Sequence, residues 1–319
     1  MRISLRAVFY LAIILGGPSE AATTFRIADS MLPEPLVLIA YGDTRFTADS
    51  ETAASSPTAR RALVAKIAAE NPAAIFINGD LPFHGIAADY EVYRTETKAW
   101  RDRHLRIYPA LGNHELSACF ESSCLERWWT AFPEMRGQRW YSVAIGSKLV
   151  GVALDSDASL LPGSVQRAWL EGQMTSLDPA VRVVLIVMHH PPVADVQTVK
   201  LVDHNARPNE QALAAYLKTV AARGAARIVV SAGHIHNYER FSQDGVTYLV
   251  SGGGGATPYE IDRTAADLYQ DAGFPNYHYV RFELRGATLS GEMIRLQDYA
   301  ARKPSRWLSK DRFEISLRP

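Results

Sequence analysis

The chain is poor in cysteine, carries no net charge and has only one long apolar run. Each of these features excludes a class of protein. Two cysteines in 319 residues are too few for a disulfide-rich scaffold. The 34 basic and 34 acidic residues balance, so the chain lacks the basic surface that nucleic acid requires. Beyond the N-terminus, no segment has the length of a membrane span. A hydrophobic content of 47% nevertheless supports a sizeable core.

The apolar run lies at the N-terminus and has the layout of a secretory signal peptide. Arg2 and Arg6 precede apolar residues 7–15, a Gly-Gly-Pro break follows, and small residues surround Ala21. Because this run is shorter than the ~20 residues of a membrane span, we expect cleavage after Ala21 and a secreted or periplasmic protein. The alternatives are an uncleaved anchor and a short buried helix. The signal peptide would comprise residues 1–21, and a single domain would comprise residues 22–319.

The two cysteines, Cys119 and Cys124, lie close together in the chain. In an exported protein they would meet an oxidising compartment, where we expect them to form a disulfide. The alternatives are free thiols and a metal-binding pair, although the other candidate ligands in the chain offer oxygen and imidazole instead of thiolate.

Apolar, β-branched segments alternate with segments of helical periodicity, which predicts an α/β fold. The early order strand–helix–strand–helix–strand indicates parallel strands joined by crossover helices. The adjacent segments 141–145 and 149–155 indicate an antiparallel hairpin. The predicted strands are 36–41, 74–78, 105–111, 141–145, 149–155, 181–188, 227–232, 246–250 and 277–284, and the predicted helices are 58–70, 87–103, 164–177 and 208–222.

Five of the predicted strands end in residues that can bind a metal ion. Each motif alone has an ordinary explanation, because a strand-end aspartate often caps a turn and a lone histidine is often a core residue. In α/β sheets, however, ligands gather beyond the carboxyl ends of strands. Five such ends in one chain therefore predict a metal site, with two metals as the favoured number. The motifs are Gly42-Asp43, Gly79-Asp80, Gly112-Asn113-His114-Glu115, His189-His190-Pro191 and Gly233-His234-Ile235-His236.

In this order, the five motifs resemble those of the calcineurin-like metallophosphoesterases, and among them the purple acid phosphatases. The matching motifs span residues 42–236, and the glycine-rich turn at 251–255 is similar as well. This turn lacks the pattern of a P-loop, so we expect it to pass close to the metal site or to another strand. The resemblance implies an α/β fold in which two mixed β-sheets pack as a sandwich flanked by helices. It also implies a hydrolase of phosphoric ester bonds, either a phosphatase or a phosphodiesterase.

The resemblance also assigns roles to the motif residues. His114 would face the substrate phosphate as an acid or an electrostatic stabiliser. Oxygen ligands mixed with imidazole suit Fe, Zn or Mn. Two such ions clamp the attacking and leaving oxygens of an in-line displacement and lower the pKa of a bound water towards ~7. The implied ligands are Asp80 as a bridge between two ions, Asp43 and His236 on the first ion, and Asn113, His189 and His234 on the second.

Two positions depart from the family pattern, and both concern the first ion. The family often has Asp-x-His in the first motif, whereas the residue here is Arg45, which stays protonated and cannot bind a metal. Purple acid phosphatases have a tyrosine in the second motif, whereas the residue here is Phe83, so we expect no tyrosinate–iron colour. Three possibilities follow. The first ion is bound weakly, or His84 supplies the missing ligand, or the first ion is absent.

Arg45 itself has two interpretations. Its guanidinium could bind phosphate oxygens, which would make Arg45 catalytic together with His114, or it could pair with a surface carboxylate.

From the motifs and the N-terminal pattern together we expect an exported phosphoesterase that hydrolyses a small phosphate ester with a metal-bound hydroxide at a dinuclear site. The alternative is a non-catalytic phosphate- or metal-binding protein on the same fold. The absence of a G-x-S-x-G motif argues against a serine hydrolase.

Overall fold

The computed structural model describes residues 24–195, 198–199, 202–297 and 305–317. The expected signal peptide, residues 1–21, lies outside these described residues. Within them, none of the helices has both the length and the apolar character needed to cross a membrane. Two large β-sheets form the body of the molecule, and a small two-stranded sheet of β8 (Thr198–Val199) and β9 (Val202–Asp203) accompanies them.

The first sheet contains seven strands in the order β1-β5-β6-β7-β10-β12-β11. Strands β6, β7, β10 and β12 pair in parallel, whereas β5 with β6 and β11 with β12 pair antiparallel. Every residue of β7 is buried, which explains its uninterrupted apolar sequence. The strands are β1 (Thr24–Ile27), β5 (Tyr141–Ile145), β6 (Leu149–Ala153), β7 (Val183–Met188), β10 (Arg227–Ala232), β11 (Tyr238–Gln243) and β12 (Val246–Ser251).

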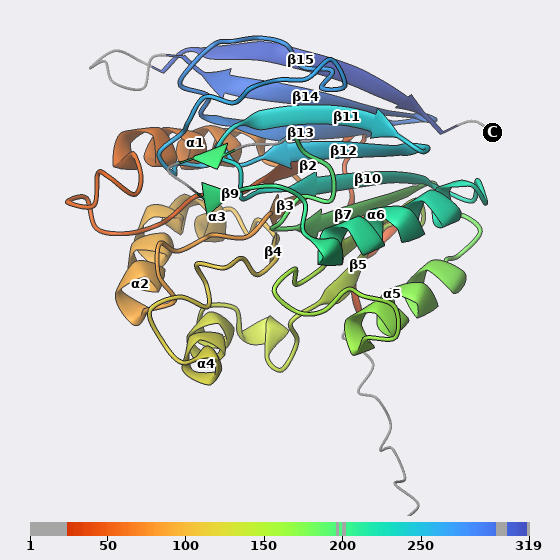
Figure 1. Ribbon diagram of the computed structural model, residues 1–319, viewed down its shortest axis with the longest axis horizontal. Coiled ribbons are helices and arrows are strands. Elements are labelled where there is room, and N and C mark those ends of the chain that lie inside the picture. Colours follow the sequence, from red (N-terminus) through yellow and green to blue (C-terminus); the bar gives the residue numbers. More distant parts are fainter. Residues whose placement is uncertain (1–23, 196–197, 200–201, 298–304, 318–319) are drawn as a thin grey trace, which may run out of the picture.

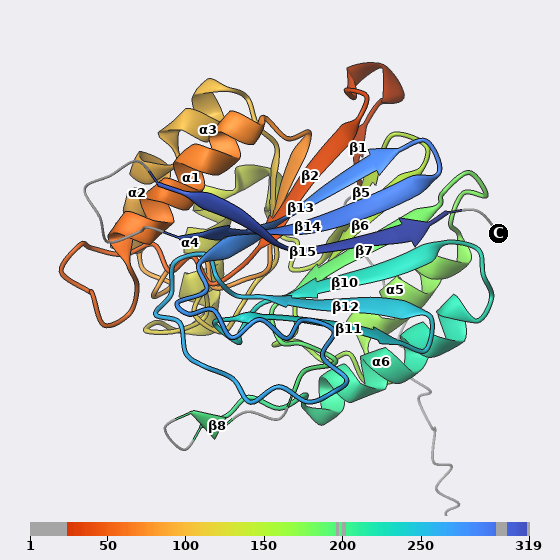
Figure 2. The same cartoon turned by 90° about the horizontal axis from the view of Figure 1, so that it is seen from above.

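The second sheet contains six strands in the order β15-β14-β13-β2-β3-β4. Strands β2, β3 and β4 are parallel, and the other neighbours are antiparallel. Figure 2 shows β13, β14 and β15 running side by side. The strands are β2 (Leu36–Tyr41), β3 (Ala74–Ile77), β4 (Ile107–Pro109), β13 (His278–Arg285), β14 (Thr288–Leu296) and β15 (Trp307–Ser316).

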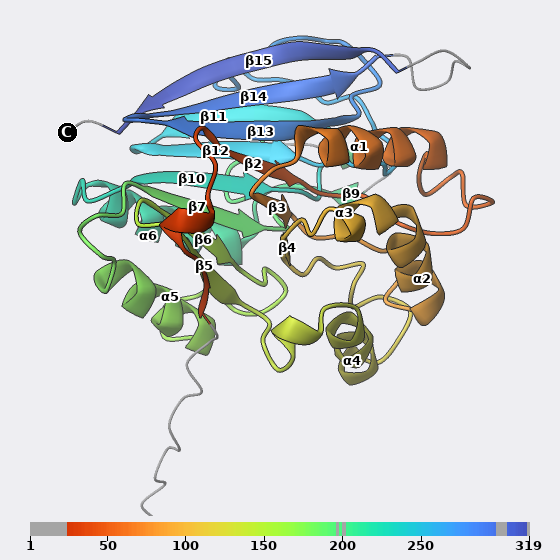
Figure 3. The same ribbon diagram turned by 180° about the vertical axis from the view of Figure 1, so that it is seen from behind.

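The two mixed sheets pack face to face and are flanked by helices, as the sequence predicts (Figure 1). Leu38 and Phe76 of the second sheet share one buried core with Val143 and Leu185 of the first. A second core joins the outer face of the first sheet to helices α5 (Val165–Thr175) and α6 (Pro208–Ala221). The other α-helices gather at one end of the sheets (Figure 3); they are α1 (Pro57–Glu70), α2 (Ala87–Glu96), α3 (Lys98–Asp102) and α4 (Glu121–Ala131).

Most of the predicted elements are present, including the hairpin of β5 and β6. The prediction of one helix over 87–103 is wrong, because the helix is interrupted at Thr97, whose hydroxyl donates to Tyr93 O at 2.6 Å. The sequence analysis also missed α4, β1, β8, β9, β11, β14 and β15. Strand β15 alternates half-buried and exposed residues and is rich in charge, so it offers no apolar run to detect.

Candidate metal centre

The five predicted motifs meet at one edge of the sandwich. Strands β2, β3 and β4 are parallel neighbours in one sheet, and β7 and β10 are parallel neighbours in the other. Asn78 links the two sheets at this edge by donating from Nδ2 to Ser231 Oγ at 2.9 Å. Asp43, Asp80 and His234 have φ values of 58°, 52° and 72°, which residues other than glycine rarely adopt. Such conformations cluster at functional sites.

Two motif glycines allow the backbone to approach the ligand side chains. A Cβ on Gly112 would lie 2.5 Å from Asp80 Oδ1, and a Cβ on Gly233 would lie 2.5 Å from Asp43 Oδ2. The glycine-rich turn approaches in the same way, because a Cβ on Gly252 would lie 2.8 Å from Asp43 Oδ2. We expected this turn to pass close to the metal site or to another strand, and the structure places it beside the candidate metal site.

On one side of the site, four side chains converge on one point. We call this set, Asp80, Asn113, His189 and His234, the Asn113 side. His189 Nε2 lies 2.9 Å from Asn113 Oδ1 and 3.2 Å from Asp80 Oδ1. The same nitrogen lies 3.2 Å from His234 Nδ1. The structure therefore brings together the residues that the resemblance assigned to the second ion.

The chemistry of these four atoms fits a metal ion. His189 Nδ1 lies 3.1 Å from Asn78 O, so this nitrogen carries the donated proton and Nε2 presents a lone pair. That lone pair faces oxygens of Asp80 and Asn113, so either a cation between the atoms or a proton on Nε2 must offset their repulsion. Burial lowers the pKa of His234 well below its usual value, which favours the neutral, metal-binding form of its ring.

The other side of the site consists of Asp43, His236 and the shared Asp80, and we call it the Asp43 side. His236 Nδ1 lies 2.8 Å from Thr257 O, so Nε2 presents its lone pair to Asp43 Oδ1 at 3.5 Å. This Oδ1 is buried and has no hydrogen-bond partner among the described residues. Burial lowers the pKa of His236 to about 3 and raises that of Asp43 to about 7. A cation would satisfy the unpaired oxygen, but this side offers one ligand fewer than the Asn113 side.

Arg45 lies at the Asp43 side and contacts the shared carboxylate. Its Nη2 donates to Asp80 Oδ2 at 3.2 Å, and its guanidinium carbon lies 5.8 Å from the centre of the Phe83 ring. The interpretation of Arg45 as the partner of a surface carboxylate is wrong, because Asp80 is fully buried. Burial alone would raise the pKa of Asp80, but the neighbouring His189, His114 and Arg45 hold it well below its usual range. The bond to Asp80 uses only Nη2 of the five-donor guanidinium, so other N–H groups of Arg45 are left for an anion.

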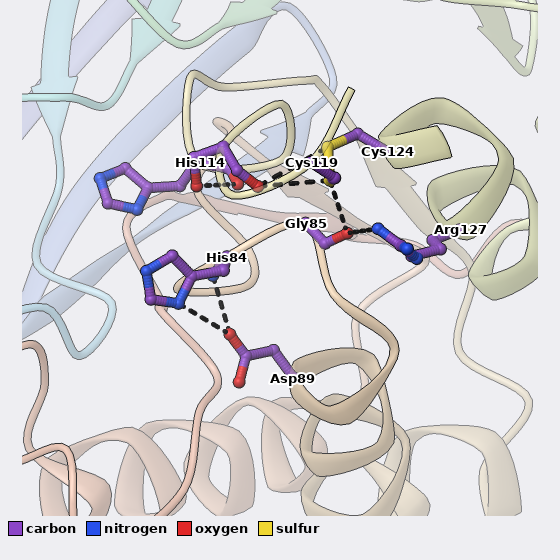
Figure 4. The surroundings of a disulfide bond; sticks show 8 residues. His84, Gly85, Asp89, His114, Cys119, Cys124 and Arg127 are labelled. Carbon is purple, nitrogen blue, oxygen red and sulfur yellow. Dashed lines mark hydrogen bonds and ion pairs between the residues drawn. A yellow bond between two sulfur atoms is a disulfide. The ribbon is translucent and has the colours of Figure 1, made fainter. Parts of the chain in front are cut away.

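His114 and His84 lie on neighbouring loops, with both rings on the side away from the disulfide (Figure 4). His114 Nδ1 contacts Phe83 O, and Nε2 lies 3.8 Å from Asp80 Oδ2. His114 is therefore placed at the site, as predicted. The His84 ring instead lies 3.8 Å from Asp89 Oδ2, which also accepts the His84 backbone N–H at 2.8 Å. In this structure His84 pairs with Asp89, and this pairing does not support a role in completing the first ion.

The predicted disulfide between Cys119 and Cys124 is present (Figure 4). It follows the His114 loop, which is tied to the preceding loop by a hydrogen bond from Gly85 N to Ser117 O at 3.2 Å. Arg127 of α4 adds a hydrogen bond to Gly85 O at 3.1 Å. These contacts hold together the two loops that carry His84 and His114.

Glu115 positions the loops around the site without taking part in either ligand set. Its Oε2 accepts the backbone N–H groups of Asp80 at 3.0 Å and Gly112 at 2.8 Å, and its Oε1 accepts that of Leu81 at 2.8 Å. The side chain is fully buried, and burial raises its pKa to about 8. Glu115 thus joins the second motif to the third through the backbone.

Two further residues reach the site and were missed by the sequence analysis. His204 Nδ1 lies 3.2 Å from His234 Nε2, and the Tyr259 hydroxyl donates to His234 O at 3.3 Å. The Tyr259 ring also lies 5.2 Å from the His236 ring, centre to centre. Neither residue follows an apolar strand, so the strand-end pattern carries no signal for them.

A family model of the calcineurin-like phosphoesterases matches residues 38–238, which is more than half of the chain. The chain belongs to this family. The matched region contains all five motifs, so the family resemblance predicted from them is confirmed.

Solved structures of low sequence identity share the fold of this phosphoesterase family member. A purple acid phosphatase from yellow lupin (Lupinus luteus) seeds has a TM-score of 0.66 and 18% identity, over 88% of this chain and 53% of the lupin chain. GAP50, the anchor in the inner membrane complex of Plasmodium, has a TM-score of 0.52 and 12% identity, over 86% of this chain and 88% of its own. This chain thus spans about half the length of the lupin enzyme. No curated protein matches the sequence.

Proposed function

We propose that the protein is an exported hydrolase that cleaves a small phosphate ester with the help of two metal ions, with Fe, Zn and Mn as the candidates. The observation that carries this proposal is the convergence of electron-pair donors on the Asn113 side, where His189 Nε2 faces oxygens at 2.9 and 3.2 Å. Membership of the calcineurin-like phosphoesterases supports phosphoric esters as the substrate class.

The ligand sets divide between the two sides of the site. Bound ions would polarise the phosphoryl group and supply a nucleophile at neutral pH. Asp80 is shared, and its depressed pKa keeps it ionised for this purpose. The other ligands would be Asn113, His189 and His234 for one ion, and Asp43 and His236 for the other.

Arg45 and His114 would bind the substrate and move a proton. The Arg45 guanidinium, which donates to Asp80 through Nη2, would use its remaining N–H groups to bind phosphate oxygens. The His114 side chain is 19% exposed, and its Nε2 faces the site because Nδ1 is held by Phe83 O. Burial lowers the pKa of His114, and a phosphate anion at Nε2 would raise it again. His114 would then donate a hydrogen bond to the phosphate or to the leaving oxygen.

Two features support export. Residues 1–21 have the charge and apolar pattern of a signal peptide. The disulfide between Cys119 and Cys124 suits an oxidising compartment, because cytosolic thiols are kept reduced. The secreted or periplasmic location is tested by fractionating cells that express the full chain and finding the mature N-terminus, which we expect at Ala22.

Hydrolysis is tested with p-nitrophenyl phosphate and bis(p-nitrophenyl) phosphate, with Mn, Zn or Fe added, together with elemental analysis of the purified protein. We expect about two ions per chain and a turnover that falls by about 10³-fold in Asp80→Asn, because the shared carboxylate is lost. Asp102→Asn, an exposed aspartate of α3, is the matched control and should keep full activity. The preferred ester separates a phosphatase from a phosphodiesterase.

The same experiment can overturn the proposal. Absence of hydrolysis with every metal, in a protein that folds normally, would exclude the hydrolase. The protein would then be a non-catalytic phosphate- or metal-binding member of the family, and calorimetric titration with inorganic phosphate would distinguish the two ligands.

A further inference from the structure

A second group of acidic side chains lies outside the candidate metal centre. We call Asp195, Glu239 and Asp267 the carboxylate cluster. One carboxylate oxygen of each residue lies within 4.8 Å of those of the other two. The three residues are 3%, 0% and 1% exposed, so all three carboxyl groups are removed from solvent. Burial of several carboxylates together is costly unless a positive charge or a proton compensates them.

Hydrogen bonds fix the cluster but leave one oxygen without a partner. Asp195 N donates to Glu239 Oε2 at 2.7 Å, and Thr264 donates to both Asp195 oxygens, at 2.8 Å from N and 2.6 Å from Oγ1. Asp267 Oδ1 accepts the N–H groups of Arg240 at 3.0 Å and Tyr269 at 2.9 Å. Glu239 Oε1, in contrast, is buried with no hydrogen-bond partner in the described part of the chain.

The charges of the cluster do not balance within the described residues. Arg263 forms an ion pair with Asp267 and also donates to Tyr238 O at 2.8 Å. Three ionised carboxylates beside this one guanidinium leave two negative charges. A divalent cation would neutralise them and would also give Glu239 Oε1 a partner.

We propose that the carboxylate cluster binds one calcium ion. The three side chains offer only oxygen atoms, which hard cations prefer, and no thiolate or imidazole that would favour zinc. The three ligand oxygens lie within 4.8 Å of one another, so a single ion with Ca–O bonds of about 2.4 Å can contact all three. Mg²⁺ fits less well, because it keeps several waters of its own.

The calcium ion would brace the loops that carry the metal centre. Asp195 follows His189 in the loop after β7, and Glu239 follows His236 at the start of β11. Asp267 belongs to the segment that begins at Thr257, whose carbonyl oxygen lies 2.8 Å from His236 Nδ1. Calcium would thus cross-link three segments that hold or support ligands, and it would raise stability without touching the substrate.

The test uses the full chain after dialysis against EGTA and removal of the chelator. Titration with CaCl₂ by calorimetry should give about one ion per chain, and CaCl₂ at 100 times its Kd should raise the Tm by about 5 °C. Glu239→Gln should lose both responses, because it removes a charge at nearly constant size. Two controls should keep them: Asp271→Asn, an aspartate of the same loop outside the cluster, and His189→Ala, which disrupts the other site. If Glu239→Gln does not fold, Asp195→Asn replaces it.

The alternative occupant of the cluster is a proton on Glu239. Burial, followed by the neighbouring Asp267 and Asp195, raises the pKa of Glu239 to about 8 when no metal is bound. A raised pKa in the folded state favours folding at low pH, and this stability is lost as the pH rises from about 4.5 towards about 8. No calcium heat in the wild type, together with a Glu239→Gln variant that lacks this pH-dependent loss, would overturn the proposal. Calcium binding that survives in Glu239→Gln would overturn it as well.

Discussion

The two sides of the candidate metal centre differ in the number and spacing of their candidate ligands. On the Asn113 side, His189 Nε2 has neighbouring donor atoms at 2.9, 3.2 and 3.2 Å. On the Asp43 side, Asp43 Oδ1 is 3.5 Å from His236 Nε2, and Arg45 already contacts Asp80 Oδ2 at 3.2 Å. Both sides share one carboxylate, but a permanent cation competes for it on the Asp43 side only.

This difference shows that one arginine can change a metal site in two ways. The Arg45 guanidinium cannot bind a metal, and its charge offsets part of the negative charge that would attract one. The same guanidinium contacts Asp80 through Nη2 and has further N–H groups that suit a phosphate anion. The Asp43 side would therefore contribute more to substrate binding and less to metal retention than the Asn113 side.

Removal of one histidine from each side should produce the largest difference. His189→Ala removes the nitrogen around which the Asn113 side converges, so we expect a loss of at least about 10³-fold in kcat/KM, together with loss of the more tightly held metal. His236→Ala should cost about 10- to 100-fold, because the Asp43 side is already depleted of ligands. Hydrolysis of p-nitrophenyl phosphate and metal content per chain measure both effects.

His104→Asn is the control for the histidine variants. His104 is exposed and has a φ of 55°, which asparagine tolerates. Its activity and metal content should match the wild type. Equal losses in His189→Ala and His236→Ala, in proteins with unchanged Tm, would contradict the proposed inequality of the two sides.

Arg45→Ala should have an intermediate effect and should move binding and metal affinity in opposite directions. Charge-assisted hydrogen bonds contribute about 1.5–3 kcal/mol each, so we expect KM for the phosphomonoester to rise about 10- to 100-fold. Metal affinity on the Asp43 side should increase, because Asp80 Oδ2 is released. Titration of metal-free protein with Zn²⁺ measures this second effect.

Arg45→Lys is the matched variant, since it keeps the charge but not the planar fork of donors. Metal affinity on the Asp43 side of Arg45→Lys should stay as low as in the wild type, because the positive charge is kept. Its affinity for the substrate should fall in part. Arg136→Ala, which removes an exposed arginine paired with Glu126, should leave both quantities unchanged. Unchanged KM and unchanged metal affinity in Arg45→Ala would limit Arg45 to bracing Asp80.

Much of the site could be predicted from the sequence, because its residues stand at the ends of buried strands. The apolar run of a strand such as Val183–Met188 predicts the strand, and the polar residues that follow it lie at a known edge of the sheet. The structure brings together all eight residues assigned in this way; they are Asp43, Arg45, Asp80, Asn113, His114, His189, His234 and His236.

The remaining features depend on contacts between segments that are distant in sequence. His204 and Tyr259 reach His234 from loops with no periodic pattern. The role of Glu115 depends on the distance between two loops, since its carboxylate accepts backbone groups from both. The carboxylate cluster could not be predicted from the sequence either. Its members come from distant segments, and each of them alone is an ordinary acidic residue.

Phe83→Tyr should have the smallest effect on activity and would report directly on the Asp43 side. The substitution adds a hydroxyl at the position where purple acid phosphatases carry a tyrosine, on a ring that stacks near His114 and Arg45. We expect less than about threefold change in kcat/KM and about 1 kcal/mol or less in stability, because the ring is only partly buried. The informative measurement is the visible spectrum after loading with Fe³⁺.

A visible absorption band in iron-loaded Phe83→Tyr, absent from the iron-loaded wild type, would show that the Asp43 side holds a metal close to this ring. Phe274→Tyr adds the same hydroxyl at an exposed phenylalanine, which is 45% accessible, and should remain colourless. If Phe83→Tyr is also colourless but Phe83→Tyr combined with Arg45→Ala is coloured, Arg45 is the group that keeps the metal away. A colourless double variant that nevertheless binds two ions per chain would place the ring outside the reach of the Asp43 side.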